Sequence, residues 1–445
     1  MHRGRKYWIV FVLFLIAAEI KAKPNDTLTT AQVESVSLKL FNDKNWKELI
    51  RYSDMVIDNG FDYYFIRMRA GIANYETKKY RKAELHFKKA LLYNEGDEDA
   101  TSYLYYCLIF DEKYEEARWL SKSFSEALAK KLKTNVAPSV SYINFEGALK
   151  LSNEHDSIGD TKYFQIGLSH YVKNRASIYH SFSFNSQEDK SNSITRGKLP
   201  PRGNMPGGTE HPAELRDYDV AKLRQYHYYL KTNIPLKHSM LLTLSGQLIY
   251  SNTMHTIYDT VYHLDSINPP PPDLHIQSPP NDGGLGFVIS TSLKKSTTHL
   301  DYSIGALADL NKGNNEYQFS AALEYHPFAN NFFNIGCIGY LHWAQSFGAT
   351  NSISYSPYLS FVPLKKLSIT ADYLHNTKGN VVEYAGYYVN NTPFFIKDKF
   401  SLGANYHFNN KLGVYINYGL ENRGSRYSDF TFTNNLFLIG IAITP

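Results

Sequence analysis

Regularly spaced acidic residues are the feature of this 445-residue sequence that most directly suggests chemistry. In THLDYSIGALADL (298–310), Asp301 and Asp309 alternate with apolar side chains, and Glu316 and Glu324 do so in the next segment. Carboxylates on one face of neighbouring strands can line a passage that prefers cations. They can equally satisfy hydrogen bonds inside a closed structure. The acidic positions predicted to face a polar interior are Glu146, Asp301, Asp309, Glu316, Glu324, Asp372 and Glu421.

Basic and catalytic groups give weaker patterns. Lys150 and Lys231 are the bases predicted on the same polar face, so acids outnumber bases there. Several histidines also fall on that face, but they lie in distant segments without the spacing of metal ligands. No Ser–His combination singles out a nucleophile. GNMPGG (203–208) lacks the strand–helix context of a phosphate-binding loop. We therefore expect no catalytic residue, no metal and no cofactor.

The elements that carry these acids have the period of β-strands. In KFSLGANYHF (399–408) and KLGVYINYGLEN (411–422), apolar and polar residues alternate. Fourteen such runs follow residue 137, with predicted starts near 138, 161, 176, 223, 238, 284, 297, 315, 331, 351, 367, 396, 411 and 431.

The connections between these runs alternate in length. Tight turns such as KNR (173–175) and PFANN (327–331) alternate mostly with long stretches, predicted to be loops, at 186–222, 252–283 and 379–395. Short turns at one end, long loops at the other and an even strand number are typical of outer-membrane β-barrels. Composition agrees, because the 36 tyrosines suit a surface that is apolar on one side and wet on the other. A soluble all-β secreted domain is the alternative.

A different period governs the region before the strands. The phrases DKNWKEL (43–49), TKKYRKAELHFKKAL (77–91) and DEKYEEA (111–117) recur at 34-residue intervals. This pattern resembles the tetratricopeptide repeat, a helix–turn–helix unit of that period whose small and aromatic residues pack neighbouring helices together. An unrelated helical bundle is the alternative. The residues predicted to pack the repeats are Trp46, Leu49, Gly71, Tyr80, Ala83, Phe87, Ala90, Tyr114 and Ala117.

The N-terminus predicts export. MHRGRKY is basic, WIVFVLFLIAA is a short apolar run, and Ala22 supplies a plausible cleavage point, which together are typical of a signal peptide. An uncleaved N-terminal anchor is the alternative. Cys107 and Cys337 fall in different predicted domains, so no disulfide framework is expected. The predicted organisation is a signal peptide at 1–22, an all-α repeat solenoid at 30–135 and an antiparallel transmembrane barrel of about 14 strands at 137–445.

This order of elements is similar to that of two groups of Gram-negative outer-membrane proteins. One comprises the exporters of poly-N-acetylglucosamine-type polysaccharide, and the other the compact repeat-plus-barrel proteins of the YaiO type. The resemblance implies a barrel in the outer membrane and a periplasmic repeat domain that recruits envelope proteins. It also implies passage of a polar polymer. The net charge of only +5 separately argues against a nucleic-acid partner. The other hypotheses are a closed barrel that only anchors an adaptor and, least favoured, a barrel enzyme.

Overall fold

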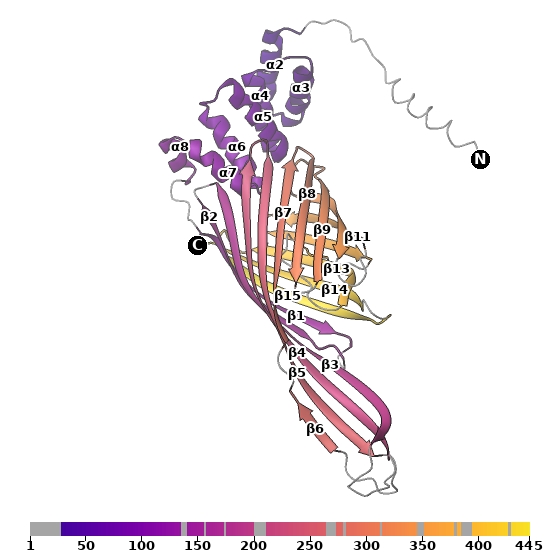
Figure 1. Ribbon diagram of the computed structural model, residues 1–445. Helices are drawn as coiled ribbons and strands as arrows, with labels where there is room; N and C mark the ends of the chain where they lie inside the picture. The colour runs from indigo at the N-terminus through magenta and orange to yellow at the C-terminus, as the bar shows by residue number, and fades with distance from the viewer. Residues whose placement is uncertain are drawn as a thin grey trace, which may run out of the picture.

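The computed structural model describes most of the chain after the N-terminal region. The described residues are 28–134, 140–154, 157–172, 175–199, 211–263, 273–278, 282–311, 314–344, 351–377, 381–383, 394–425 and 429–445. The predicted signal peptide at 1–22 lies outside these residues. Two parts follow one another along the chain, a helical domain and a β-barrel (Figure 1).

The helices of the first part recur at the spacing that the sequence repeats indicate. Three of them begin at Thr30, Tyr64 and Glu98, and the helices that follow each begin at Trp46, Tyr80 and Tyr114. Within each of these two series, every helix therefore begins 34 residues after the previous one. The helices are α2 (Thr30–Asn42), α3 (Trp46–Asp58), α4 (Tyr64–Glu76), α5 (Tyr80–Tyr93), α6 (Glu98–Phe110), α7 (Tyr114–Leu120), the 3-10 helix η1 (Ser121–Ser123) and α8 (Glu126–Lys131).

The turns within the helix pairs repeat as well. Lys44, Lys78 and Glu112 all have a positive φ, between 52° and 61°, and all stand two residues before the next helix. A non-glycine residue in this left-handed region is uncommon. Its recurrence shows that the three turns share one backbone conformation. Among the described helices, none is long and apolar enough to cross a lipid bilayer.

The core of the helical domain contains most of the residues predicted to pack it. Tyr80, Ala83, Phe87 and Ala117 belong to one buried cluster, which also contains Cys107. Gly71 lies directly under the Phe87 ring, where a Cβ would come within 2.7 Å of it. Leu49 and Trp46 pack in a second cluster, and Ala90 is also fully buried. Tyr114 differs, because it begins the short helix α7 and keeps 48% of its surface exposed.

The second part is a closed antiparallel barrel. Its strands are β1 (Val140–Ser152), β2 (Thr161–Val172), β3 (Ala176–Leu199), β4 (His211–Leu236), β5 (Met240–His263), β6 (Asp273–Gln277), β7 (Asp282–Ser296), β8 (Leu300–Asn311), β9 (Asn314–Tyr325), β10 (Phe333–Ala344), β11 (Ser352–Leu364), β12 (Leu367–Asn376), β13 (Phe394–His407), β14 (Leu412–Ser425) and β15 (Thr431–Ile443).

Closure follows from the strand pairing. The first strand β1 pairs with the last strand β15, and the sheet continues through neighbours to the pair β4–β5. Within the described residues, the short strand β6 pairs only with β5 and stays outside the ring, so fourteen of the fifteen described strands form the barrel. The predicted strand number is confirmed. Every ring strand has a partner on both sides, as a barrel surrounded by hydrocarbon requires.

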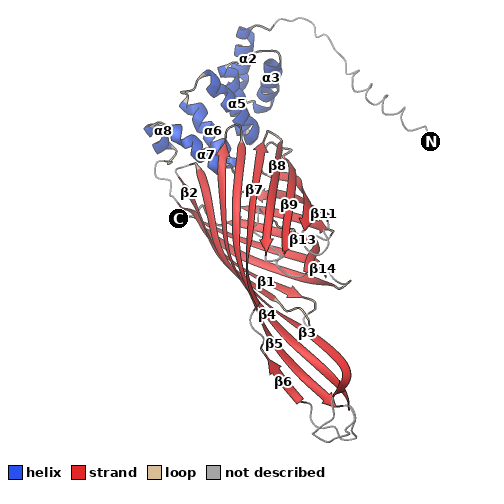
Figure 2. Cartoon of the chain, viewed as in Figure 1, coloured by secondary structure: helices blue, strands red, loops and turns tan. Residues whose placement is uncertain are grey.

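Two of the predicted long loops are wrong over most of their length. Strands β3, β4 and β5 have 24, 26 and 24 residues, so β3 and β4 continue through most of 186–222 and β5 continues to residue 263. About ten residues cross a membrane, so the extra length forms an arm that projects from the barrel (Figure 2). The prediction failed because KSNSITRGKL has no apolar alternation. In the arm, backbone pairing such as Lys190 with Val220 continues regardless of side-chain type.

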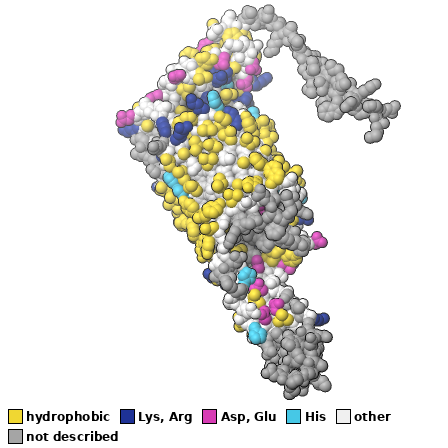
Figure 3. Space-filling model, viewed as in Figure 1, with side chains coloured by type: hydrophobic (Ala, Val, Ile, Leu, Met, Phe, Trp, Pro, Cys, Tyr) yellow, Lys and Arg dark blue, Asp and Glu magenta, His cyan; other side chains and the backbone are white. Residues whose placement is uncertain are grey.

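Apolar side chains cover the outside of the barrel. Figure 3 shows them as a belt between the helical domain and the arm. Exposed members include Phe164, Phe182, Tyr228, Leu248, Phe287, Ile304, Phe319, Leu341, Ile353, Phe400, Ile416 and Phe437. Contiguous apolar surface of this extent is not a property of ordinary soluble monomers. Cys337 is also exposed, whereas Cys107 lies in the helical core, and neither forms a disulfide.

Candidate functional site: the lumen and its roofed mouth

Polar side chains fill the interior of the barrel on the side of β1 to β3. Gln165 donates to the Tyr179 hydroxyl at 3.0 Å, and that hydroxyl donates to Asn144 at 3.1 Å. The Asn144 amide and the Tyr415 hydroxyl both donate to Glu146, at 3.1 and 2.6 Å. The period-two alternation brings these groups together, because residues i and i+2 of a strand share one face. These side chains form one connected hydrogen-bond network on this side of the interior.

The acidic residues predicted to face inward are all away from the apolar exterior. Asp301, Asp309 and Glu316 are buried, Glu421 is completely buried, and Asp372, Glu146 and Glu324 are half-buried. Asp309 lies directly opposite Glu316 on the neighbouring strand. The structure does not gather the seven into one cluster, since they are distributed over β1, β8, β9, β12 and β14.

Basic side chains accompany several of these acids, and two of them, Lys150 and Arg423, are buried. Lys150 reaches Glu421 at 2.9 Å, and Arg423 donates to the same carboxylate at 2.9 Å. Lys294 lies 2.8 Å from Asp301. Sequence reasoning named Lys150 but missed Lys294, Lys399 and Arg423. Their two-residue spacing from inward residues such as Ser401 and Glu421 is a signal that could have found them. Among the described residues, the lumen is therefore lined by both signs of charge.

A short piece of the β12–β13 connection, residues 381–383, lies within the lumen; we call it the inner segment. Val382 exchanges two hydrogen bonds with the Gln318 side chain of β9, at 3.0 and 3.1 Å. Val381, Val382 and Glu383 are each no more than 5% exposed. The prediction of an external loop over 379–395 is wrong for these three residues.

Apolar packing and one ion pair hold the inner segment. Val382 belongs to one buried cluster with Ile249, Val288 and Leu307 of β5, β7 and β8, and Val381 belongs to another with residues of β10, β12 and β13. Glu383 accepts from Lys399 of β13 at 2.7 and 2.9 Å, with both side chains nearly buried. Because the segment touches strands on several sides, it narrows the lumen.

The helical domain covers the end of the barrel where the tight turns lie (Figure 1). Arg81 of α5 donates its backbone N–H to Ala329 in the β9–β10 turn at 3.0 Å. In the same turn, Asn330 donates to the Lys78 carbonyl and Asn331 to the Asp111 carbonyl, both at 2.8 Å. Further along the rim, Ser177 and Asn233 both donate to Glu115, at 2.6 and 3.1 Å, and Arg118 lies 4.1 Å from the centre of the Tyr171 ring.

A cavity of about 430 Å³ remains between the helical domain and the lumen; we call it the vestibule. Its roof is the α6–α7 turn with the start of α7, including Asp111, Glu112 and Lys113. Its wall is formed by residues at the turn ends of β5 and β7 through β13, among them Lys294, Asp301 and Glu324. The vestibule therefore lies at the mouth of the barrel, and its lining is predominantly charged or polar.

Buried charges of the helical domain and the barrel meet at this roof. Arg81 forms an ion pair with Asp301 of β8, and its Nε lies 3.4 Å from Asp111. These three side chains are at most 6% exposed. Lys113 pairs with Glu84 at 2.7 Å and with Asp111 at 2.8 Å.

The roof also changes the acidity of its own groups. Burial acts to raise the pKa of Glu84, but Lys113 and Lys88 beside it outweigh burial and hold that pKa at about 2. Glu84 also accepts from Ser239 in the β4–β5 turn at 3.3 Å. The carboxylate is therefore charged at neutral pH, and it links the helical domain to the barrel.

Comparisons with known proteins give only distant structural similarity. No protein-family model and no curated protein matches the chain. Among solved structures, the toluene transporter TodX of Pseudomonas putida aligns with 69% of this chain and 91% of its own, with 7% identity and a TM-score of 0.39. The KdgM porin, solved in complex with disordered oligogalacturonate, aligns with 52% of this chain and 99% of its own (10% identity, TM-score 0.29).

A third similar structure is the translocator domain of the autotransporter NalP from Neisseria meningitidis. It aligns with 76% of this chain and 98% of its own, with 10% identity and a TM-score of 0.27. These values are too low to carry a conclusion about what this chain does. The barrel itself is established by its own strand pairing.

Proposed function

We propose that this protein is an outer-membrane β-barrel channel of a Gram-negative envelope, with its helical domain in the periplasm. The observation that carries the proposal is a closed ring of fourteen strands with an apolar exterior and a polar, charged interior. Closed barrels satisfy every backbone polar group in hydrocarbon, and short turns are typical of the periplasmic end. The helical domain sits at that end.

Small polar solutes are the cargo that the lumen favours. Its lining offers carboxylates, ammonium groups, amides and hydroxyls, while the inner segment and the roof each occupy part of the way through the barrel. Passage of a polar polymer such as an exopolysaccharide is the more specific form of the proposal. That form requires the inner segment and the roof to move aside.

Conductance of the full chain in a planar lipid bilayer tests the channel. We expect small single-channel steps, because the lumen is narrowed at two levels, together with heat-modifiable mobility on a gel. The alternative is a closed barrel that anchors an adaptor domain without transport. The filling of the β1–β3 side by the Tyr179 and Tyr415 networks favours this second function. A protein that inserts but never conducts, even after the roof and the inner segment are released by substitution, supports the anchor.

The helical domain is proposed to be a tetratricopeptide-type module that recruits an envelope protein. Support comes from the 34-residue recurrence of helix starts and of the positive-φ turns. Leu92 is 71% exposed on α5 and offers a site for a photo-crosslinking amino acid. We expect a discrete protein adduct from position 92 in intact cells and none from Ile304, which is equally apolar and 66% exposed on the barrel belt. Identical patterns from both positions contradict recruitment.

A further inference from the structure

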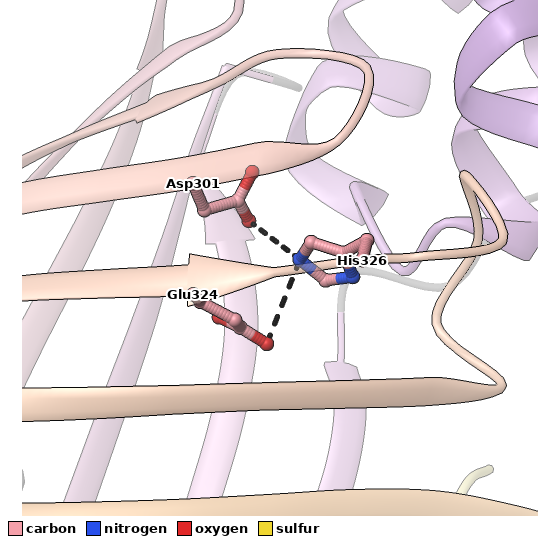
Figure 4. Close-up of side chains that lie close together, drawn as sticks. All are labelled: Asp301, Glu324 and His326. Carbon is pink, nitrogen blue, oxygen red and sulfur yellow. Dashed lines mark ion pairs between the residues drawn. The ribbon is translucent and has the colours of Figure 1, made fainter. Parts of the chain in front are cut away.

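We propose that Asp301, Glu324 and His326 form a binding site for a divalent transition-metal cation, best matched by Zn²⁺, in the wall of the vestibule. Figure 4 shows the three side chains pointing toward one another from the start of β8, the end of β9 and the turn that follows β9. One ligand atom from each lies within 4.8 Å of the other two. The part of the chain that the structure describes contains no second cluster of this kind.

The orientation of His326 is the first observation that points to a cation. Its Nδ1 lies 3.3 Å from the Asn330 carbonyl oxygen, which can only accept a hydrogen bond, so Nδ1 carries the proton. In the neutral ring, Nε2 then presents a lone pair. That atom is buried and has no hydrogen-bond partner, while the residue is only 2% exposed. A lone pair directed at two carboxylates is repulsive unless a positive charge lies between them.

The distances are the second observation. His326 Nε2 is 3.5 Å from Asp301 Oδ2 and 3.6 Å from Glu324 Oε1, which is longer than a good hydrogen bond. Zn²⁺ binds nitrogen and carboxylate oxygen at about 2.0–2.2 Å with tetrahedral geometry. Two ligands of one such ion are then separated by roughly 3.3–3.5 Å. These two distances from Nε2 to carboxylate oxygens are therefore close to those between atoms that share a metal, and the two carboxylate oxygens lie within 4.8 Å of each other.

The surrounding groups orient these ligands as outer-shell partners do around known metal sites. The Asn330 carbonyl fixes the imidazole through Nδ1. Arg81 of the helical domain holds the other oxygen of Asp301, Oδ1, which leaves Oδ2 directed at His326. The vestibule borders all three ligands and gives room for a water molecule as the fourth ligand.

Lys294 is the competitor that a metal must displace. Its Nζ lies 2.8 Å from Asp301 Oδ2 and 3.9 Å from Glu324 Oε2, so it supplies positive charge there without a metal. The Lys294 side chain is 41% exposed and can turn toward solvent, whereas Arg81 is buried and stays on Oδ1. Because Arg81 belongs to α5 and the ligands belong to the barrel, a bound cation would couple the two parts of the protein.

The test uses the full chain in detergent, stripped of metal with a chelator. Titration with Co²⁺ should give the intense visible absorption bands of four-coordinate cobalt at one equivalent, and Zn²⁺ should abolish them. Competition with a chromophoric chelator should give one tight Zn²⁺ site per chain. We expect His326→Gln and Glu324→Gln to weaken that site at least tenfold. His407→Gln is the matched control, because His407 borders the same vestibule away from the carboxylates, and it should leave affinity unchanged.

Three results would overturn the site: no tight Zn²⁺ binding by the wild-type chain, equal affinity in the His326 and His407 variants, or cobalt spectra of six-coordinate ions only. Any of them would mean that Asp301, Glu324 and His326 contact one another and Lys294 without sharing a metal. The cobalt spectrum is recorded on the wild-type chain, so it does not depend on whether a variant folds. Heat-modifiable mobility shows that each variant barrel is intact.

Discussion

Replacing Arg81 with alanine is expected to destabilise the docking of the helical domain on the barrel by about 3–5 kcal/mol, as for other broken buried ion pairs. The substitution leaves the carboxylates of Asp301 and Asp111 buried without this guanidinium. Both carboxylates are better solvated by water than by this interface, so the helical domain is expected to separate more readily from the mouth of the barrel. Denaturant titration followed by the helical circular dichroism signal measures the loss of stability, because the barrel contributes little to that signal. Larger conductance steps in a planar bilayer should accompany it.

A neighbouring residue on the same helix provides the control. Lys82 pairs with Asp54 at 3.3 Å, but both side chains are substantially exposed. Surface pairs contribute about 0–1 kcal/mol, so Lys82→Ala should change neither stability nor conductance measurably. If the Arg81 and Lys82 variants unfold at the same denaturant concentration, the buried contact does not hold the roof.

Lys399→Glu is expected to expel the inner segment and to raise single-channel conductance at least twofold. The substitution removes the ion pair with Glu383, about 3–5 kcal/mol, and adds like-charge repulsion of about 4 kcal/mol at 4 Å and an effective dielectric constant of about 20. The two hydrogen bonds of Val382 contribute about 0.5–1.5 kcal/mol each, and burial of the two valines about 1.5–3 kcal/mol each. The electrostatic cost is therefore comparable to or larger than the stabilisation that these remaining contacts provide.

Lys397→Glu makes the same charge change two residues away and serves as the control. The Lys397 side chain is exposed, so its replacement should leave conductance near the wild-type value. Unchanged steps in the Lys399 variant, with normal heat-modifiable mobility, would show that the inner segment does not limit the passage.

Strand number and most strand positions could be predicted because the barrel exterior faces one solvent and the interior another. Apolar and polar residues therefore alternate with a period of two in segments such as β13 and β14. The arm was not predicted because it projects from the barrel and neither of its faces needs to be apolar. Its segment KSNSITRGKL therefore shows no alternation of apolar and polar residues. The 34-residue recurrence of the helices could be predicted for a similar reason, since stacked helices of one kind repeat the same contacts.

The candidate sites depend on contacts that no local pattern contains. The alternation of apolar and polar residues predicted that Asp301 and Glu324 face the interior. It gave no indication that Arg81, more than 200 positions earlier, would contact Asp301. His326 was not singled out, because it follows β9 in a turn and its partners lie on two strands. The spacing of metal ligands in sequence is informative when one helix or loop supplies them, and here none does.

The sequence alone determined the period of each part: 34 residues for the helices and two for the strands. These periods reflect the local backbone geometry and the solvent on each face of an element. Both impose a regular pattern of residue types along the sequence. Only the tertiary structure decided that the helical domain covers the mouth, that residues 381–383 lie inside the lumen, and which acid meets which base. Those outcomes depend on buried charges finding partners across long sequence separations, and burial of a charge is a property of the folded chain.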